Sequence, residues 1–182
     1  IDAFFINSGV ATCENLQEIY APKVEANKDN LDYLKQVISV MGMLGCKEAE
    51  AYFAASEAAH AIEPTAATAI GCGYMYYKKG DFEKCLGYFD QAIELEQDPI
   101  KKADYLYSAA TILFSQKQLS KAKQYARKAI ENNGEFGKPY MLIGQMYATS
   151  PNWSEEAALN KCTFFAVIDK MQKAKSVDPS CA

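Results

Sequence analysis

The sequence predicts an all-α protein in which one helix hairpin is repeated along the chain. In the clearest copy, an apolar pattern of helical period leads into the turn Lys79-Gly80-Asp81, and a second such pattern follows it. Gly73 on the first pattern and Ala92 on the second are small enough for two antiparallel helices to approach closely. One hairpin cannot bury its apolar face alone, so we expect neighbours of the same kind.

The hairpin recurs at a nearly constant spacing. When the small residues early in the second helices are aligned, Cys85 against Ala122, hairpins begin near residues 33, 66, 103 and 137. These steps of 33, 37 and 34 residues match a helix–turn–helix repeat of about 34 residues. We therefore predict a single solenoid over residues 1–182, with repeats at about 1–32 (partial), 33–65, 66–102, 103–136 and 137–182.

The start of the chain has the pattern of the second half of a hairpin. Residues 1–10 look like a helix end followed by a stop. Thr12 is the expected N-cap of a helix that runs to residue 26, and Pro22 inside that helix predicts a kink or an early end.

The next hairpin is marked by its caps. Asn30 is the expected N-cap of a helix over residues 31–44, and an alanine-rich helix over 48–62 completes the pair. Either Thr65 or Thr68 is then expected to cap the clearest copy.

The hairpin after the clearest copy is lengthened at its start. Pro99 suits the first turn of its first helix, which continues over residues 104–115. The second helix is expected over 120–132, with Asn133-Gly134 as its C-cap and turn.

The last hairpin departs from the repeat. Its first helix, over residues 138–148, is regular, but an insertion near 149–160 follows. Ser154 is the expected cap of a long second helix to about Val177, preceded by a loop that carries Trp153.

Two residue patterns recur on the predicted helices: Tyr140-x-x-Ile143-Gly144-x-x-Tyr147 on a first helix and Cys85-x-x-x-Phe89-x-x-Ala92 on a second helix. With these patterns, the repeats over residues 33–179 resemble the tetratricopeptide repeat family. The resemblance implies an alpha-alpha superhelix, a right-handed solenoid of helix hairpins. It also implies that the first helices line a concave face that binds a protein or peptide.

The expected concave face is aromatic and apolar. By helical spacing, its candidate partner-binding residues are Tyr74, Tyr77, Lys78, Tyr107, Thr111, Phe114, Lys138, Met141 and Gln145. The same reasoning adds Ile70, and Val37, Met41 and Leu44 in the preceding hairpin. Exposed aromatic clusters usually mark a contact surface, although neighbouring helices could instead cover these rings.

One subtype of the family grips a terminal carboxylate with Lys and Asn side chains on this face. The corresponding places here hold Ile70, Tyr74, Ser108, Lys138 and Leu142. Only Lys138 suits a carboxylate, so we expect recognition of an apolar or extended peptide instead.

The six cysteines do not form a metal motif. No CxxC pair is present and His60 is the single histidine, so we expect no metal site and no cofactor. Cys72 and Cys85 are expected to be buried free thiols rather than a bridge. Cys13 and Cys46 occupy places that a solenoid can bring together, so they are either a disulfide or free thiols, depending on the redox compartment.

Nothing in the sequence supports an enzyme. There is no nucleophile elbow, phosphate-binding loop or paired histidine motif, so no catalytic residue is assigned. The net charge of −4 with scattered lysines disfavours nucleic-acid binding, and no apolar run approaches the roughly 18 residues of a membrane span. We predict a non-enzymatic protein–protein interaction scaffold. The alternatives are a structural spacer or self-association segment of a longer exported protein, or repeats that assist a catalytic domain elsewhere.

Two short segments carry a further resemblance, to exported tetratricopeptide proteins of gut-type Bacteroidetes. They are Asp98-Pro99-x-Lys101-Lys102-Ala103-Asp104-Tyr105 and Val177-Asp178-Pro179-Ser180. This resemblance implies a periplasmic or otherwise exported location, with the cytoplasm as the alternative, and it favours the Cys13–Cys46 bridge. Because the chain starts at Ile1 and ends without a capping helix, we expect it to be a piece of a longer protein.

Overall fold

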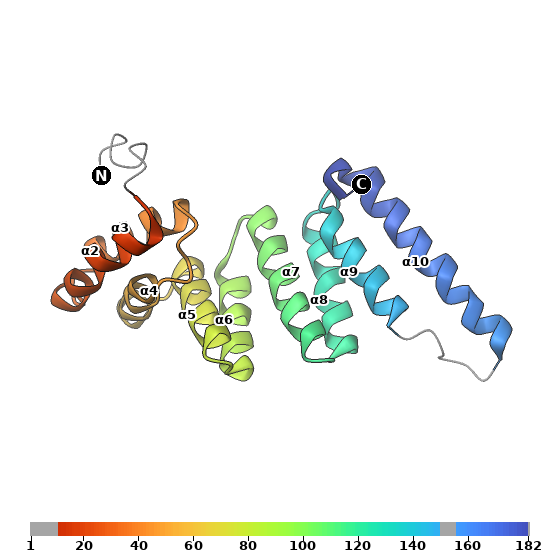
Figure 1. The fold of residues 1–182 in the computed structure, drawn as a ribbon, viewed down its shortest axis with the longest axis horizontal. Helices are drawn as coiled ribbons and strands as arrows, with labels where there is room; N and C mark the ends of the chain where they lie inside the picture. The colour runs from red at the N-terminus through yellow and green to blue at the C-terminus, as the bar shows by residue number, and fades with distance from the viewer. Residues whose placement is uncertain (1–10, 150–155, 182) are drawn as a thin grey trace. The chain divides into compact units, whose positions relative to one another are not determined.

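Every regular element in the described part of the chain is a helix. A computed structural model describes residues 11–149 and 156–181, and Figure 1 shows their helices following one another as hairpins. The predicted fold class, an all-α repeat of tetratricopeptide-type helix hairpins, is confirmed. The chain divides into two compact units, Ile1–Leu95 and Glu96–Ala182. The single solenoid over residues 1–182 stays a prediction.

Unit 1 holds five helices within its described residues. They are α2 (Cys13–Ala26), α3 (Leu31–Met43), α4 (Glu50–Ile62), α5 (Ala66–Lys78) and α6 (Phe82–Leu95). Helix α4 packs on α2, on α3 and on α5, and α5 packs on α6. The α5–α6 pair is the hairpin that the sequence shows most clearly.

Unit 2 repeats this arrangement with a longer last helix. Its elements are α7 (Pro99–Ser115), α8 (Leu119–Asn132), α9 (Gly137–Ala148), α10 (Ala157–Val177) and the 3₁₀ turn η1 (Pro179–Cys181). Helix α8 packs on both α7 and α9, while α10 and η1 pack on α9. The lengthened start of α7, with Pro99 in its first turn, is confirmed.

The predicted N-caps explain where the helices of unit 1 begin. The Thr12 hydroxyl accepts a hydrogen bond from the Asn15 amide at 3.3 Å, and the Asn30 side chain accepts one from the Tyr33 amide at 3.1 Å. Thr65 and Thr68 form a reciprocal capping box, so both candidates for that position take part. The predicted helix end at Ala26 is confirmed, and of the two effects expected of Pro22, a kink or an early end, the early end is wrong.

Several expectations concern parts of the chain outside the described residues. These are the helix end within residues 1–10, the cap at Ser154 and the loop at Trp153. The extended last helix is confirmed, but it begins at Ala157 with Glu156 as its N-cap, later than expected.

Small residues let paired helices come close in both units. Ala59, Ala92, Ala129 and Ala174 occupy matching positions on four second helices, and all four are fully buried. In the α5–α6 hairpin, a Cβ on Gly73 would lie 2.9 Å from the Phe89 ring, so only glycine fits without a shift.

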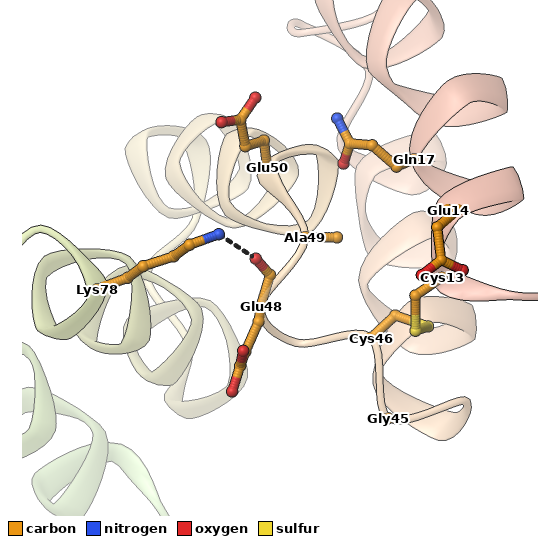
Figure 2. Close-up of a pocket in the computed structure, with 9 residues that line it drawn as sticks. All are labelled: Cys13, Glu14, Gln17, Gly45, Cys46, Glu48, Ala49, Glu50 and Lys78. Atoms are coloured by element: carbon orange, nitrogen blue, oxygen red, sulfur yellow. Dashed lines mark hydrogen bonds between the residues drawn. A yellow bond between two sulfur atoms is a disulfide. The ribbon is translucent and has the colours of Figure 1, made fainter.

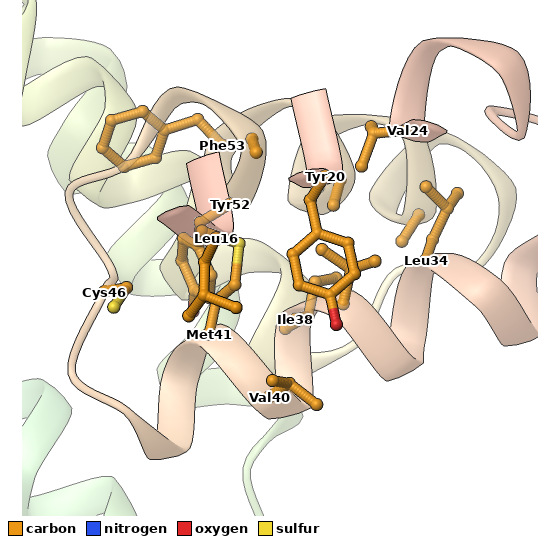
Figure 3. Close-up of a cluster of buried hydrophobic side chains, with 14 of the residues drawn as sticks. Leu16, Tyr20, Val24, Leu34, Ile38, Val40, Met41, Cys46, Tyr52 and Phe53 are labelled. Atoms are coloured by element: carbon orange, nitrogen blue, oxygen red, sulfur yellow. The ribbon is translucent and has the colours of Figure 1, made fainter. Parts of the chain in front are cut away.

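The core of unit 1 corrects part of the expected concave face. Figure 3 shows side chains from three helices in one apolar cluster, including Leu16, Tyr20, Leu34, Met41 and Tyr52. Val37 and Met41 are fully buried in this cluster, and Ile70 is also buried. Their assignment to an open face is therefore wrong, because α3 and α5 each turn these residues toward neighbouring helices.

Candidate partner-binding site

A pocket in unit 2 gathers four of the predicted binding residues. Tyr107 on α7 and Lys138, Met141 and Gln145 on α9 line one cavity of about 330 Å³. Leu142, Ser180 and Cys181 complete its lining. The walls thus combine an aromatic ring and two apolar side chains with one ammonium group and several hydrogen-bonding groups.

Helical periodicity places the α9 residues on one side of that helix. Lys138, Met141 and Gln145 are spaced by three and four residues, so their side chains share a face. Opposite them, the Tyr107 ring is held edge-on to Phe136, with 5.2 Å between ring centroids. The ring is half-buried, which leaves part of it open to a ligand.

The C-terminal turn forms the other wall of the pocket. It approaches the start of α9 so closely that a Cβ on Gly137 would meet Asp178 and lie 2.7 Å from the Cys181 sulfur. The Ser180 hydroxyl donates to Asp178 Oδ1 at 2.6 Å, and this bond holds the pKa of the Asp178 carboxyl below its usual value. Burial raises the pKa of the Cys181 thiol, which donates to Asp178 Oδ2.

The remaining predicted residues of unit 2 lie outside this lining. Thr111 is exposed and its hydroxyl donates to the Tyr107 carbonyl, one turn earlier in α7. Phe114 is half-buried near the end of the same helix. Both are on the expected stripe of α7, but neither lines the cavity.

The three predicted residues of unit 1 are engaged to different degrees. The Tyr74 ring packs edge-on against the buried Phe89, at 5.5 Å between centroids, so it belongs partly to the core. Tyr77 is 47% exposed and touches Phe82 with one ring edge. The Lys78 ammonium donates to the Glu48 carbonyl at 2.9 Å and lies over the Phe53 ring.

Lys78 also lines a second cavity, of about 450 Å³, beside a disulfide (Figure 2). Cys13 at the start of α2 is bonded to Cys46 in the α3–α4 connection, with 5.3 Å between their Cα atoms. Glu14, Glu48 and Glu50 give the rim of this cavity an acidic character.

Two contributions to these sites were not expected from the sequence. Ser180 and Cys181 follow the last helix of the repeat, where no motif marks them as pocket residues. Gln17 on α2 caps α4, since its side-chain oxygen accepts a hydrogen bond from the Ala51 amide at 2.8 Å. The sequence indicated a missing local cap, because Ala49, the N-cap residue of α4, has no side chain able to accept a hydrogen bond.

The thiols and the histidine show no reactive arrangement. Cys72 and Cys85 are buried free thiols, as predicted, and burial raises their pKa values to about 12 and about 11. The His60 ring lies 3.0 Å from the Thr68 hydroxyl through Nδ1. Across residues 11–149 and 156–181, no group of three or more His, Cys, Asp or Glu side chains converges as a metal site would need.

Within the same ranges, no helix is both long enough and apolar enough to cross a bilayer.

Comparisons with known proteins place these features in context. No family model matches the chain. Stress-induced-phosphoprotein 1 of Caenorhabditis elegans is 31% identical over 80 residues, which make up 44% of this chain and 24% of that protein. Hsp70-Hsp90 organizing protein 1 of Glycine max is 29% identical over 104 residues, 56% of this chain and 17% of that protein. The chain therefore spans about a quarter or less of these curated relatives.

Two solved structures share the fold over nearly the whole chain. A crystal structure of MamA superposes with a TM-score of 0.71 at 15% identity, covering 97% of this chain and 95% of that one. A second MamA structure gives 0.69 at 16% identity, covering 95% and 85%. At these identities the likeness concerns the fold alone.

The repeat spacing, the helix hairpins and these likenesses agree with one another. The chain has the fold of a tetratricopeptide-type helical repeat.

Proposed function

We propose that the chain is a non-enzymatic scaffold that binds an extended partner peptide in the unit 2 pocket. The observation that carries this proposal is the convergence of four residues, chosen from the family resemblance and helical spacing, on one cavity. Tyr107 comes from one helix and the other three from another, so the cavity depends on the packing of α7 and η1 against α9.

The lining indicates the kind of peptide that would fit. Tyr107, Met141 and Leu142 offer an apolar surface for one large side chain of the partner. Lys138 is exposed at the rim, where an Asp or Glu next to that side chain would meet its ammonium group. Gln145 and Ser180 can exchange hydrogen bonds with an extended backbone.

The name of one relative, Hsp70-Hsp90 organizing protein 1, raises the question of whether the partner is a chaperone tail. A terminal carboxylate would need Lys and Asn groups at the places that hold Ile70 and Leu142, and both of these side chains are buried. We therefore infer that the partner is recognised by internal side chains rather than by its C-terminus.

Unit 1 offers a further contact for a partner. Tyr77 is the most exposed of the predicted aromatic residues on α5, and Lys78 is already held in place beside it. In this proposal Tyr77 supplies apolar contact area and Lys78 orients the partner.

The test is selection of binding peptides from a random-peptide display library against the whole chain. Peptides with one large apolar residue beside an acid should be enriched. Their affinity should fall about tenfold with Lys138→Ala and more with Met141→Asp. Lys121→Ala is the matched control, because Lys121 is an exposed lysine of the same unit outside the pocket.

Three results would count against the proposal. One is equal binding of the selected peptides to the Lys138, Met141 and Lys121 variants. Another is a melting temperature that drops sharply in the Lys138 variant, which would show a structural role instead. The third is binding that disappears when the peptide carboxyl terminus is amidated, which would favour a carboxylate grip.

A second candidate function is a structural or self-association segment. An exposed apolar face on α10 favours it, and that face takes no part in the pocket.

A further inference from the structure

Helix α10 carries three large apolar side chains that stand in solvent. Phe164 is 67% exposed, Phe165 is 72% exposed and Ile168 is 51% exposed. They lie within two turns of one helix, so they form one continuous stripe. Isolated exposed apolar residues are common, but a cluster of two phenylalanines and an isoleucine usually marks an interface.

The equivalent position on two earlier second helices, α4 and α8, contacts the following helix. On α4, the residue six positions before the buried Ala59 is Phe53, and it contacts Lys78 of the following helix α5 at 5.6 Å. On α8, the residue six positions before Ala129 is Lys123, which lies 5.1 Å from the Tyr147 ring of the following helix α9. This position therefore faces the next helix in both units.

On α10 the matching residue is Ile168, six positions before the buried Ala174. The main contacts of α10 are with α9 and η1, and its approach to Gly144 of α9 is made by Val167, Lys170 and Met171 rather than by the stripe. The stripe is thus the surface on which a further helix would stack, and it continues an interface that the chain already uses twice.

We propose that this stripe binds α10 of a second copy of the chain, in antiparallel orientation. The orientation follows from α4 and α5. His60, next to Ala59 near the end of α4, contacts Thr68 in the first turn of α5, while Lys78 at the end of α5 lies over Phe53 near the start of α4. A helix that lies on α10 in the same manner begins beside Lys175, the counterpart of His60.

The charges of α10 suit this arrangement. Its N-cap is Glu156, whereas its last turns carry Lys173 and Lys175. An antiparallel pair brings the Glu156 N-cap of each helix toward the basic end of the other, which also complements both helix dipoles. The interface is isologous, because the same stripe serves both copies.

The register follows from the apolar residues. A two-fold axis near Ala166 sets Phe164 of each copy opposite Ile168 of the other. Glu156 lies ten residues before Ala166 and Lys175 nine after it, so the charged ends also meet. Phe165 lies one residue from the axis, close to Phe165 of the second copy.

The small size of the stripe limits the affinity. A standard stable interface buries about 800 Å² on each partner, more than three side chains supply. We therefore expect a reversible dimer with a dissociation constant on the order of 10 to 1000 µM.

The first experiment is sedimentation equilibrium of the whole chain over a wide concentration range. Cys162→Ser and Cys181→Ser are included to prevent chance disulfides between copies. The mass should rise toward that of a dimer, and Phe165→Ala with Ile168→Ala should raise the dissociation constant at least tenfold. Ile100→Ala is the control, because Ile100 is an equally exposed apolar residue on α7 of the same unit, and it should change nothing.

The second experiment tests the register. In the same background, Phe165→Cys should form a covalent dimer on mild oxidation, and Ile100→Cys should not. A chain that stays monomeric at every concentration would overturn the proposal, as would a dimer that the α10 variants leave intact. A melting temperature lowered by the α10 double variant at a concentration where the parent chain is monomeric would also overturn it, since these side chains would then be part of the core.

Discussion

Replacing Gly71 by alanine tests how tightly the hairpins of unit 1 stack. Gly71 on α5 faces Ser56 on α4, and a Cβ added at Gly71 would overlap both the Cβ and the hydroxyl oxygen of Ser56. Serine is too short to swing its Cβ away, so the two helices would have to separate. Gly87 provides the matched control: it also lies inside a helix, α6, but a Cβ there would meet nothing within 4 Å.

The two substitutions should change stability in opposite directions. Alanine in place of glycine favours a helix by up to about 1 kcal/mol, which is the whole effect expected for Gly87→Ala. At Gly71 the same gain is set against overpacking, which costs about 3 kcal/mol when a rigid neighbour must move. The net loss is about 2 kcal/mol, so the two variants should differ by about 3 kcal/mol.

Urea unfolding followed by circular dichroism measures this difference. With a slope of about 2 kcal/mol per molar urea, the midpoints should lie about 1.5 M apart. Ser56→Gly should recover part of the stability lost in Gly71→Ala, because it removes the atoms that clash. Equal midpoints for Gly71→Ala and Gly87→Ala would refute the close packing of α4 and α5.

Two further predictions concern the cysteines. Unreduced, denatured protein should show four free thiols, and Cys13→Ser with Cys46→Ser should lower the free energy of unfolding by about 4 kcal/mol, because the bond closes a loop over a sequence separation of 33 residues. Six free thiols would contradict the bond and argue against an exported setting. Burial raises the pKa of the thiols of Cys72 and Cys85 to about 12 and about 11 from 9.0, so the unfolded chain loses these protons first. The contribution of these thiols to the free energy of unfolding should therefore be fully present below pH 9 and be lost as the pH rises from 9 toward 11 and 12. Cys72→Ala should make this decrease smaller. A free energy of unfolding that does not change over this pH range in the parent chain would contradict the burial.

Local signals in the sequence were sufficient to predict where most of the helices lie. The caps at Thr12, Asn30 and Thr65 each depend on a side chain and an amide three residues apart, which a sequence shows directly. The same holds for the hairpin alignment, because the buried alanines recur at matching positions.

The site residues that were wrongly assigned or missed depend on contacts between distant segments. Helical spacing placed Val37, Met41 and Ile70 on an open stripe, but a helix inside a stack has more than one buried side, and spacing alone does not say which neighbours cover it. Ser180 was missed as a pocket residue because only the approach of η1 to Gly137 brings it there. Four residues of unit 2 did meet in one cavity, since α7 and α9 are successive first helices of the same repeat.

The cap that Gln17 places on Ala51 has a consequence for folding. Helix α4 has no local group to start it, so its first turn is complete only once α2, 34 residues upstream, has docked. Nucleation of α4 is thereby tied to a non-local event, which raises the contact order of unit 1 and makes its helices fold as a cooperative group. When α2 detaches in the native ensemble, the start of α4 frays with it, so the two segments share one opening free energy and exchange their amide hydrogens as a single foldon.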